Sequence, residues 1–250
     1  MSHARSGGED LPRTAEVTSD EVAEHLHAMV LSDDYPCLGA RSVFTRKTAH
    51  VELVDELADP ESRALYEALA EYAATTGRDA DDTTFVSFVA AFRRPVVSSE
   101  AEFEELLWRQ LAQLHALDTG DSQAWDPAVS ADPSNPHFAF SIAGVAFFVV
   151  GMHPRASRIA RRTPWPVLVF NLHRQFEALR ASERYERMRD TIRRRDVRLQ
   201  GSVNPMVADH GSVSEARQYS GRAVRTGWEP PVELTDVELT DPEAPGNEET

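Results

Sequence analysis

Three separated segments of this chain carry side chains that could bind a ligand or take part in a reaction. The first, DDYPCLG at 33–39, contains the single cysteine, Cys37, in a turn that could present its thiolate as a nucleophile or ligand. The sequence identifies no charged neighbour that would lower the pKa of this thiol. A lone cysteine is often a small buried apolar residue, so both interpretations stay open.

The second segment, VVGMHPRASRIARRTPWP at 149–166, combines a histidine with a cluster of arginines. His153 follows an apolar strand and precedes Pro154, and a rigid strand end is a good position from which to present a ligand. Arginines pair bidentately with carboxylates or phosphates, so the cluster could hold an anionic cofactor or form surface ion pairs. The cluster consists of Arg155, Arg158, Arg161 and Arg162.

The third segment, VFNLHRQFEALR at 169–180, places His173 where a strand gives way to a helix. Asn171 could cap this helix through its amide oxygen. His173, Glu177 and Arg180 are at helical spacing and should share a face. A histidine at a helix start is about as often structural as functional. Known metal, phosphate-binding and nucleophile-elbow spacings are absent from the sequence, so spacing alone does not name the chemistry.

A further stretch, GSVNPMVADHGSVSEARQYSGR at 201–222, fits neither a helical nor a strand period. Structureless segments of this length within a domain are usually either functional or disordered. We expect this one to be ordered and to contribute to a site. Its reactive side chains are those of Asn204, Asp209, His210, Glu215, Arg217, Gln218, Tyr219 and Arg222.

The composition limits the class of protein. The 250 residues carry a net charge of −15, which argues against nucleic acid as a partner. No apolar run approaches the roughly 18 residues of a membrane span, and the first residues lack the apolar core of a signal peptide. These features predict a cytoplasmic protein without a membrane partner. Lys47 is the single lysine, a pattern typical of a very salty cytoplasm or of a GC-rich genome.

The periodicity of apolar residues predicts the α+β class. We expect a single domain over 19–228 with a mostly antiparallel central sheet flanked by helices, a disordered segment at 1–18 and an acidic disordered tail at 229–250. The expected helices are 19–31, 60–76, 99–117, 173–181 and 185–199. The expected strands are 41–46, 50–54, 83–92, 138–142, 145–151 and 166–172, with a hairpin turn at 143–144.

Taken together, several of these segments resemble the YqcI/YcgG family, which is also described by an FPC/CPF motif. The resemblance rests on YPC at 35–37, GMHPRASRIARR at 151–162, PVLVFNLHRQFEALR at 166–180, YERMRDTIRRRD at 185–196 and QGSVNPMVADHGSVSEARQYSGR at 200–222. It spans roughly 19–222 and is most specific in the last block. The chain departs from the motif because Tyr35 replaces the phenylalanine and Leu38-Gly39 follows Cys37.

Characterised relatives in this family are b-type haem proteins that hydroxylate guanidino nitrogens. The resemblance therefore implies a haem-dependent oxygenase that N-hydroxylates a guanidino or amino group of an arginine-like small metabolite. Haem b, dioxygen and an unidentified electron donor would take part. The alternative is a non-catalytic haem-binding or sensor protein.

The resemblance also suggests roles for the candidate residues. Haem iron needs an axial ligand, for which His153 is the first choice, His173 the second and Cys37 the third. The arginine cluster would pair with the haem propionates. Asp209 and Glu215 would bind a guanidinium substrate, while Tyr219 and Asn204 would position oxygen or substrate.

Overall fold

The protein is described by a computed structural model that covers residues 17–60, 62–81, 84–182, 185–203, 213–225 and 227–234. The predicted disorder at both ends concerns segments that lie largely outside these residues. The helices are α1 (Ser19–Leu31), α2 (Leu38–Arg46), α3 (Arg63–Tyr72), α4 (Glu100–Gly120), α5 (His173–Arg180) and α6 (Tyr185–Gln200). Short helical turns are η2 (Ala73–Gly77), η3 (Ile159–Arg161) and η4 (Glu215–Gln218).

Five strands form one sheet in the order β1-β2-β5-β4-β3. They are β1 (Ala49–Glu56), β2 (Ser87–Arg94), β3 (Phe140–Ile142), β4 (Val145–Met152) and β5 (Val167–Leu172). Among the described strands, β1 pairs with β2 in parallel, and the other strand pairs are antiparallel. The predicted α+β class with a mostly antiparallel sheet is therefore confirmed. The β3–β4 hairpin turns at Ala143-Gly144, where both φ angles are positive, as a type I′ hairpin turn requires.

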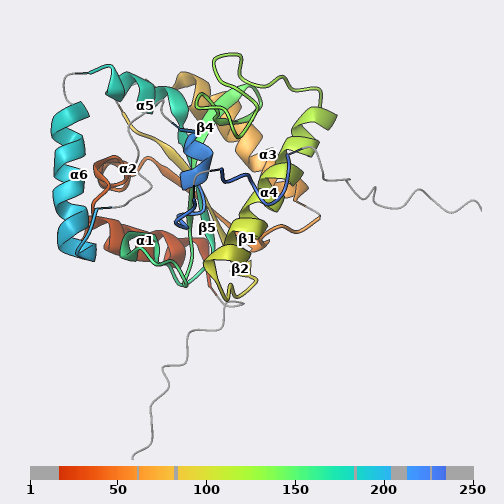
Figure 1. The fold of residues 1–250 in the computed structure, drawn as a ribbon. Helices are drawn as coiled ribbons and strands as arrows, with labels where there is room; N and C mark the ends of the chain where they lie inside the picture. The colour runs from red at the N-terminus through yellow and green to blue at the C-terminus, as the bar shows by residue number, and fades with distance from the viewer. Residues whose placement is uncertain are drawn as a thin grey trace, which may run out of the picture.

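The two faces of the sheet are covered by different helices (Figure 1). Alternate strand residues such as Phe88, Phe147 and Phe170 pack against α3 and α4 and form the larger core. The intervening residues, including Val89 and Val167, pack against α1 in a second, smaller core. Each fully buried leucine or phenylalanine contributes roughly 1.5–3 kcal/mol. Both faces therefore support the sheet, and the second one carries the candidate site.

Two predictions of local structure are wrong. Residues 41–46 belong to helix α2 rather than to a strand, because Cys37 caps the helix and Gly39 and Val43 share its buried face. Asn171 does not cap α5, since the N-cap position is Leu172 and no side-chain cap hydrogen bond forms. The Asn171 amide instead bridges strands, accepting from Ser87 Oγ at 2.7 Å and donating to the Phe148 carbonyl at 3.2 Å.

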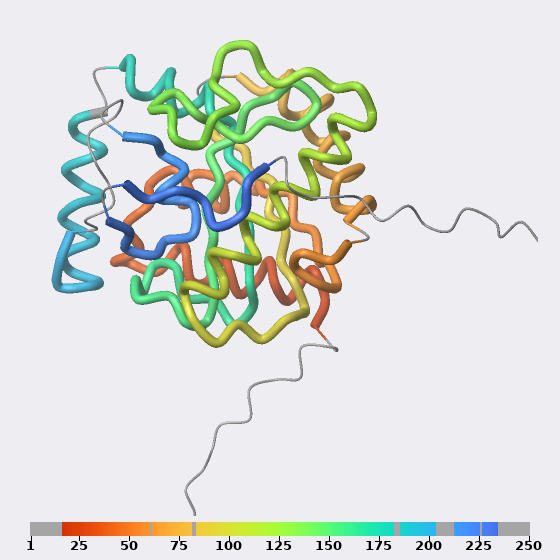
Figure 2. The backbone as a smooth tube through the Cα atoms, turned by 45° about the vertical axis from the view of Figure 1, so that its right-hand side comes forward, coloured from red at the N-terminus to blue at the C-terminus, as the bar shows by residue number. Residues whose placement is uncertain are grey.

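Residues 213–222 of the 201–222 stretch lie beside β4 (Figure 2, blue). The Gly151 amide donates to the Tyr219 carbonyl oxygen at 2.7 Å, beyond the part of β4 that pairs with β3. Tyr219 is fully buried, and its hydroxyl donates to the Phe147 carbonyl at 3.3 Å. This segment thus supports the edge of the sheet. Within the described residues, none of the helices has the length and hydrophobicity needed to cross a bilayer.

Candidate active site

A cavity of about 250 Å³ lies between the second face of the sheet and helices α1, α2, α5 and α6. Its walls are mainly apolar, with valines from three strands and a cluster of three phenylalanine rings. Phe176 lies 5.8 Å from Phe85 and 5.6 Å from Phe148 between ring centroids. The polar side chains that line the cavity are Tyr35, Cys37, Ser87, Arg158, Arg161, Asn171, Asp196 and Gln218.

Cys37 reaches this cavity because it is the N-cap residue of α2. Its sulfur accepts a hydrogen bond from the Ala40 amide at 3.4 Å. Burial raises the pKa of the Cys37 thiol, whereas the amides of Ala40 and Gly39 and the charge of Arg161 act in the opposite direction. The charged neighbour that the sequence could not identify is therefore Arg161, which comes from the η3 turn.

Arg161 is held in place by the C-terminal segment. Its Nη1 donates to the carbonyl oxygens of Gly151 and Tyr219, each at 3.0 Å. Its side chain lies over Gly221, where a Cβ atom would be only 3.2 Å from Arg161 Cδ. Burial lowers the pKa of Arg161 to about 10, while Tyr35 and Cys37 oppose that shift. The guanidinium therefore stays charged at neutral pH.

A buried ion pair joins the cavity wall to α6. Arg158 Nη2 lies 2.5 Å from Asp196 Oδ1, and both side chains are about 10% exposed. Arg158 also donates to the hydroxyl and the carbonyl oxygen of Ser202, at 3.1 and 2.9 Å. Gln200, the last residue of α6, accepts a hydrogen bond at 2.8 Å from the amide of Ile159, the residue after Arg158. Polar contacts therefore fasten α6 beside the cavity.

His153 lies in a different environment. It is fully buried, and its ring stacks on Phe103 with centroids 4.2 Å apart. Its Nδ1 accepts from the Arg155 amide at 3.3 Å, and its Nε2 has no hydrogen-bond partner among the described residues. Burial lowers the pKa of His153 to about 4. His153 is not among the described residues that line the Cys37 cavity.

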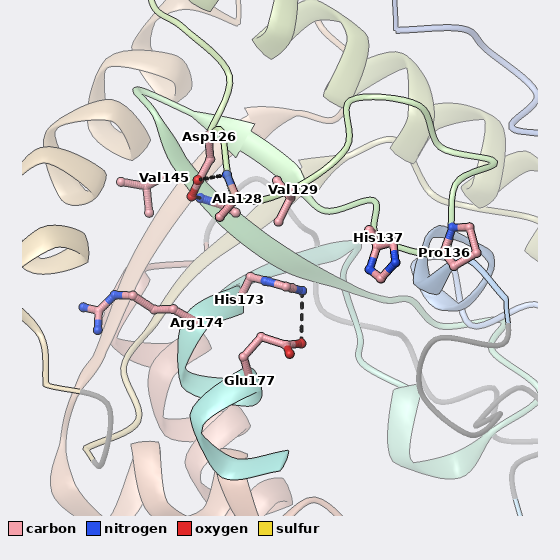
Figure 3. Close-up of a pocket in the computed structure, with 10 residues that line it drawn as sticks. Asp126, Ala128, Val129, Pro136, His137, Val145, His173, Arg174 and Glu177 are labelled. Atoms are coloured by element: carbon pink, nitrogen blue, oxygen red, sulfur yellow. Dashed lines mark hydrogen bonds and ion pairs between the residues drawn. The ribbon is translucent and has the colours of Figure 1, made fainter. Parts of the chain in front are cut away.

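His173 lines a second cavity of about 320 Å³, together with Asp126, His137 and Glu177 (Figure 3). His173 Nε2 lies 3.5 Å from Glu177 Oε1, and Glu177 also pairs with Arg180. The predicted common face of these α5 side chains is confirmed. The three candidate axial ligands therefore occupy separate places in the fold.

Of the residues predicted to contact substrate or oxygen, the structure describes Glu215 and Tyr219. Glu215 is buried and forms an ion pair with Arg180, and it is not among the described residues that line the Cys37 cavity. Tyr219 is a core residue whose ring stacks on Trp108, and it is not among the described residues that line the Cys37 cavity. The other predicted residues, Asn204, Asp209 and His210, lie outside the described residues.

Of the four clustered arginines, two reach the cavity and two are exposed. Arg158 and Arg161 line the cavity, while Arg155 and Arg162 face solvent. Gln218, one of the reactive side chains of the 201–222 stretch, lines the cavity, whereas sequence reasoning missed Asp196. Asp196 comes four residues after Ile192 in an arginine-rich helix, so the two side chains share a face. This spacing could have indicated that Asp196 points inward to the cavity together with Ile192. Among the described residues, no three His, Cys, Asp or Glu side chains are grouped to hold a metal ion.

Comparison with known proteins gave one informative result. No curated protein and no solved structure matched the chain. The model of the YqcI/YcgG family matches residues 26–233, which is most of the 250 residues. The matched region includes all the segments that line the Cys37 cavity, from Leu26 to Gln218. The chain therefore belongs to the YqcI/YcgG family.

Proposed function

We propose that this protein is a haem-dependent oxygenase that hydroxylates a guanidino or amino nitrogen of an arginine-like small metabolite. The observation that carries the proposal is the position of Cys37, whose thiol lines an apolar, aromatic-walled cavity with two arginines in its wall. The family resemblance contributes the expectation of a b-type haem.

The donor set of the cavity fits a haem. Cys37 is a possible thiolate ligand to iron, and thiolate ligation favours cleavage of the O–O bond of dioxygen. Phe85 and Phe148 would contact the macrocycle, and Arg158 and Arg161 would pair with its propionates. Cys37 becomes the first candidate ligand in place of His153, because His153 is packed on Phe103 and is not among the described lining residues.

The size of the cavity sets a requirement. Its volume of about 250 Å³ is just below the roughly 300–1,000 Å³ of typical small-molecule sites. A haem is larger than this, so binding requires an outward shift of one wall. We propose that the α6 wall shifts, because none of the described apolar side chains of α6 is fully buried.

The proposed reaction converts R–NH₂, O₂, two electrons and two protons into R–NHOH and water. A haem, when bound, would supply the activation of dioxygen, and an external one-electron donor would supply the electrons. The chain would bind and orient the substrate in an apolar enclosure. Asp196 is the one carboxylate among the described lining residues, and Gln218 offers an amide oxygen as a second acceptor for a guanidinium.

The first experiment is an absorption spectrum of protein produced with a haem precursor. We expect a Soret band that shifts on reduction and carbon monoxide binding to the position of a thiolate-ligated haem. Cys37→Ser should lose that thiolate signature, and the matched control His173→Ala should keep it. A featureless spectrum from folded protein would reject the haem proposal.

Two further results would separate the alternatives. An unchanged carbonyl spectrum in Cys37→Ser, with loss of the band in His153→Gln, would return the axial ligand to His153. Absence of hydroxylated product from arginine-like compounds, with haem, dioxygen and reductant all present, would favour a non-catalytic haem-binding or sensor protein.

A further inference from the structure

Helix α6 carries a positive charge that contrasts with the rest of the chain. Its sixteen residues include six arginines and three acidic residues, a net charge of +3 in a protein of −15. Arg187, Arg194 and Arg198 follow one another at intervals of seven and four residues, so they lie on one face of the helix. All three are exposed. We call these three residues the arginine stripe.

Among the described residues, the arginine stripe has one ion pair, which is exposed. No carboxylate of the described residues forms a salt bridge with Arg187 or Arg194, and Arg194 donates to the Thr191 hydroxyl at 2.9 Å. Arg198 Nε lies 3.6 Å from Asp34, but the two side chains are 63% and 48% exposed. A surface pair of this kind is weak, so Arg198 can exchange Asp34 for another carboxylate.

The opposite face of the same helix lines the Cys37 cavity. Ile192 and Asp196 point to the cavity, and helical geometry places the arginine stripe roughly half a turn away from them. One helix diameter, about 10 Å, therefore separates the stripe from the cavity. A protein bound to the stripe would be close to a cofactor in the cavity.

We infer that the arginine stripe is the docking surface for an acidic one-electron carrier protein. The inference rests on the proposed function, because an oxygenase of this kind consumes two electrons per turnover, and in that proposal an external one-electron donor supplies them. A positive patch attracts a carrier of opposite charge and increases the rate at which the two proteins meet.

The charge distribution favours a small protein over nucleic acid or an anionic membrane. Charges are screened beyond about 10 Å at 0.1 M salt, so a compact carrier on α6 would respond mainly to the stripe. A duplex or a membrane is an extended polyanion and would also face the acidic surface that gives the chain its charge of −15. A helix of sixteen residues, about 24 Å long, matches the footprint of a small protein.

The test compares two triple charge reversals that change the net charge equally. One is Arg187→Glu, Arg194→Glu and Arg198→Glu, in the stripe. The control reverses three exposed arginines on α3, α4 and the C-terminal segment, namely Arg63, Arg109 and Arg225. The probe is a purified acidic ferredoxin. Its binding is measured by calorimetry at low salt, and its reduction of the haem is followed by stopped flow under carbon monoxide.

We expect the stripe variant to bind ferredoxin at least about tenfold more weakly than wild type and to be reduced by it at least about tenfold more slowly. The affinity and the reduction rate of the control variant should change much less. Replacement of the stripe by glutamines should give an intermediate effect, and added salt should reduce the difference. Dithionite, a small reductant, should reduce the haem of all variants at similar rates.

Three results would overturn the inference. The first is that both charge reversals weaken ferredoxin binding equally. The second is that wild-type protein does not bind ferredoxin. The third is that a DNA duplex or anionic vesicles, and not ferredoxin, bind in a way that depends on the arginine stripe. Calorimetry is also performed on protein without haem. Absence of a Soret band therefore counts against the proposed function, whereas absence of stripe-dependent binding counts against the docking surface.

Discussion

Removing the carboxylate of Asp196 should destabilise the protein strongly. Its partner Arg158 is buried and lies 2.5 Å away, and each side chain of the pair is about 10% exposed. Asp196→Ala would leave the guanidinium buried beside Ser202 without this counter-ion. Breaking a buried ion pair in this way costs about 3–5 kcal/mol. In a domain of this size that corresponds to a fall in melting temperature of roughly 6–20 °C.

The assay is urea unfolding followed by circular dichroism, with thermal unfolding as a second measurement. The matched control is the double variant Arg158→Met with Asp196→Leu, which removes both charges and retains apolar volume. It should recover most of the lost free energy of unfolding, because apolar replacement of a whole buried pair is often neutral or stabilising. A cost below about 1 kcal/mol for Asp196→Ala is the value of a solvated surface pair. That result would refute the argument that this contact fastens α6.

Three other predictions address the surroundings of the cavity. Gly151→Ala should cost about 1–3 kcal/mol of unfolding free energy, because the added Cβ would lie 2.6 Å from a ring carbon of Phe103. The control is Gly120→Ala, which should be neutral or stabilising because no atom lies within 4 Å of the added Cβ. Equal effects of the two substitutions would contradict the packing argument. Stability should fall as the pH drops from 6.5 towards 4, because the pKa of His153 is lowered to about 4 and the unfolded chain then binds the extra proton. The slope is up to about 1.4 kcal/mol per pH unit, His153→Gln should reduce it, and an unchanged slope would show that other groups cause it. The rate of alkylation of Cys37 by iodoacetamide should have its pH midpoint above that of an ordinary thiol, because burial raises the pKa of the Cys37 thiol. A midpoint below that of an ordinary thiol would mean that the charge of Arg161 has a larger effect than burial.

The elements that sequence analysis predicted well have strong and unambiguous periodicity. The long amphipathic helix α4 and the β3–β4 hairpin are examples, since their apolar spacing and turn residues agree with each other. Residues 41–46 failed because Val43 and Phe44 between polar neighbours resemble a short strand. The helix is favoured by the capping sulfur of Cys37 and by the burial of Gly39. A short hydrophobic pattern contains no information about either contact.

The candidate site was predicted in its parts but not in its arrangement. Cys37 and Arg161 were both identified as candidates, yet their common cavity depends on a sheet that brings distant segments together. His153 ranked first because a strand end usually presents a side chain outward. In this fold α4 covers that strand end, and Phe103 packs on the imidazole ring. Such burial depends on tertiary packing, which spacing along the chain cannot report.

The C-terminal stretch is the most specific part of the family resemblance, and its described residues have a structural explanation. Gly221 has a φ of 82° and leaves room for the Arg161 side chain, which a larger residue would displace. The Tyr219 carbonyl accepts from Arg161, while the Tyr219 hydroxyl bonds to the sheet. These residues therefore hold a guanidinium beside the Cys37 thiol without lining the cavity themselves. A sequence motif of this kind can be essential to a site because it positions the residue that acts, and its own side chains need not contact the substrate.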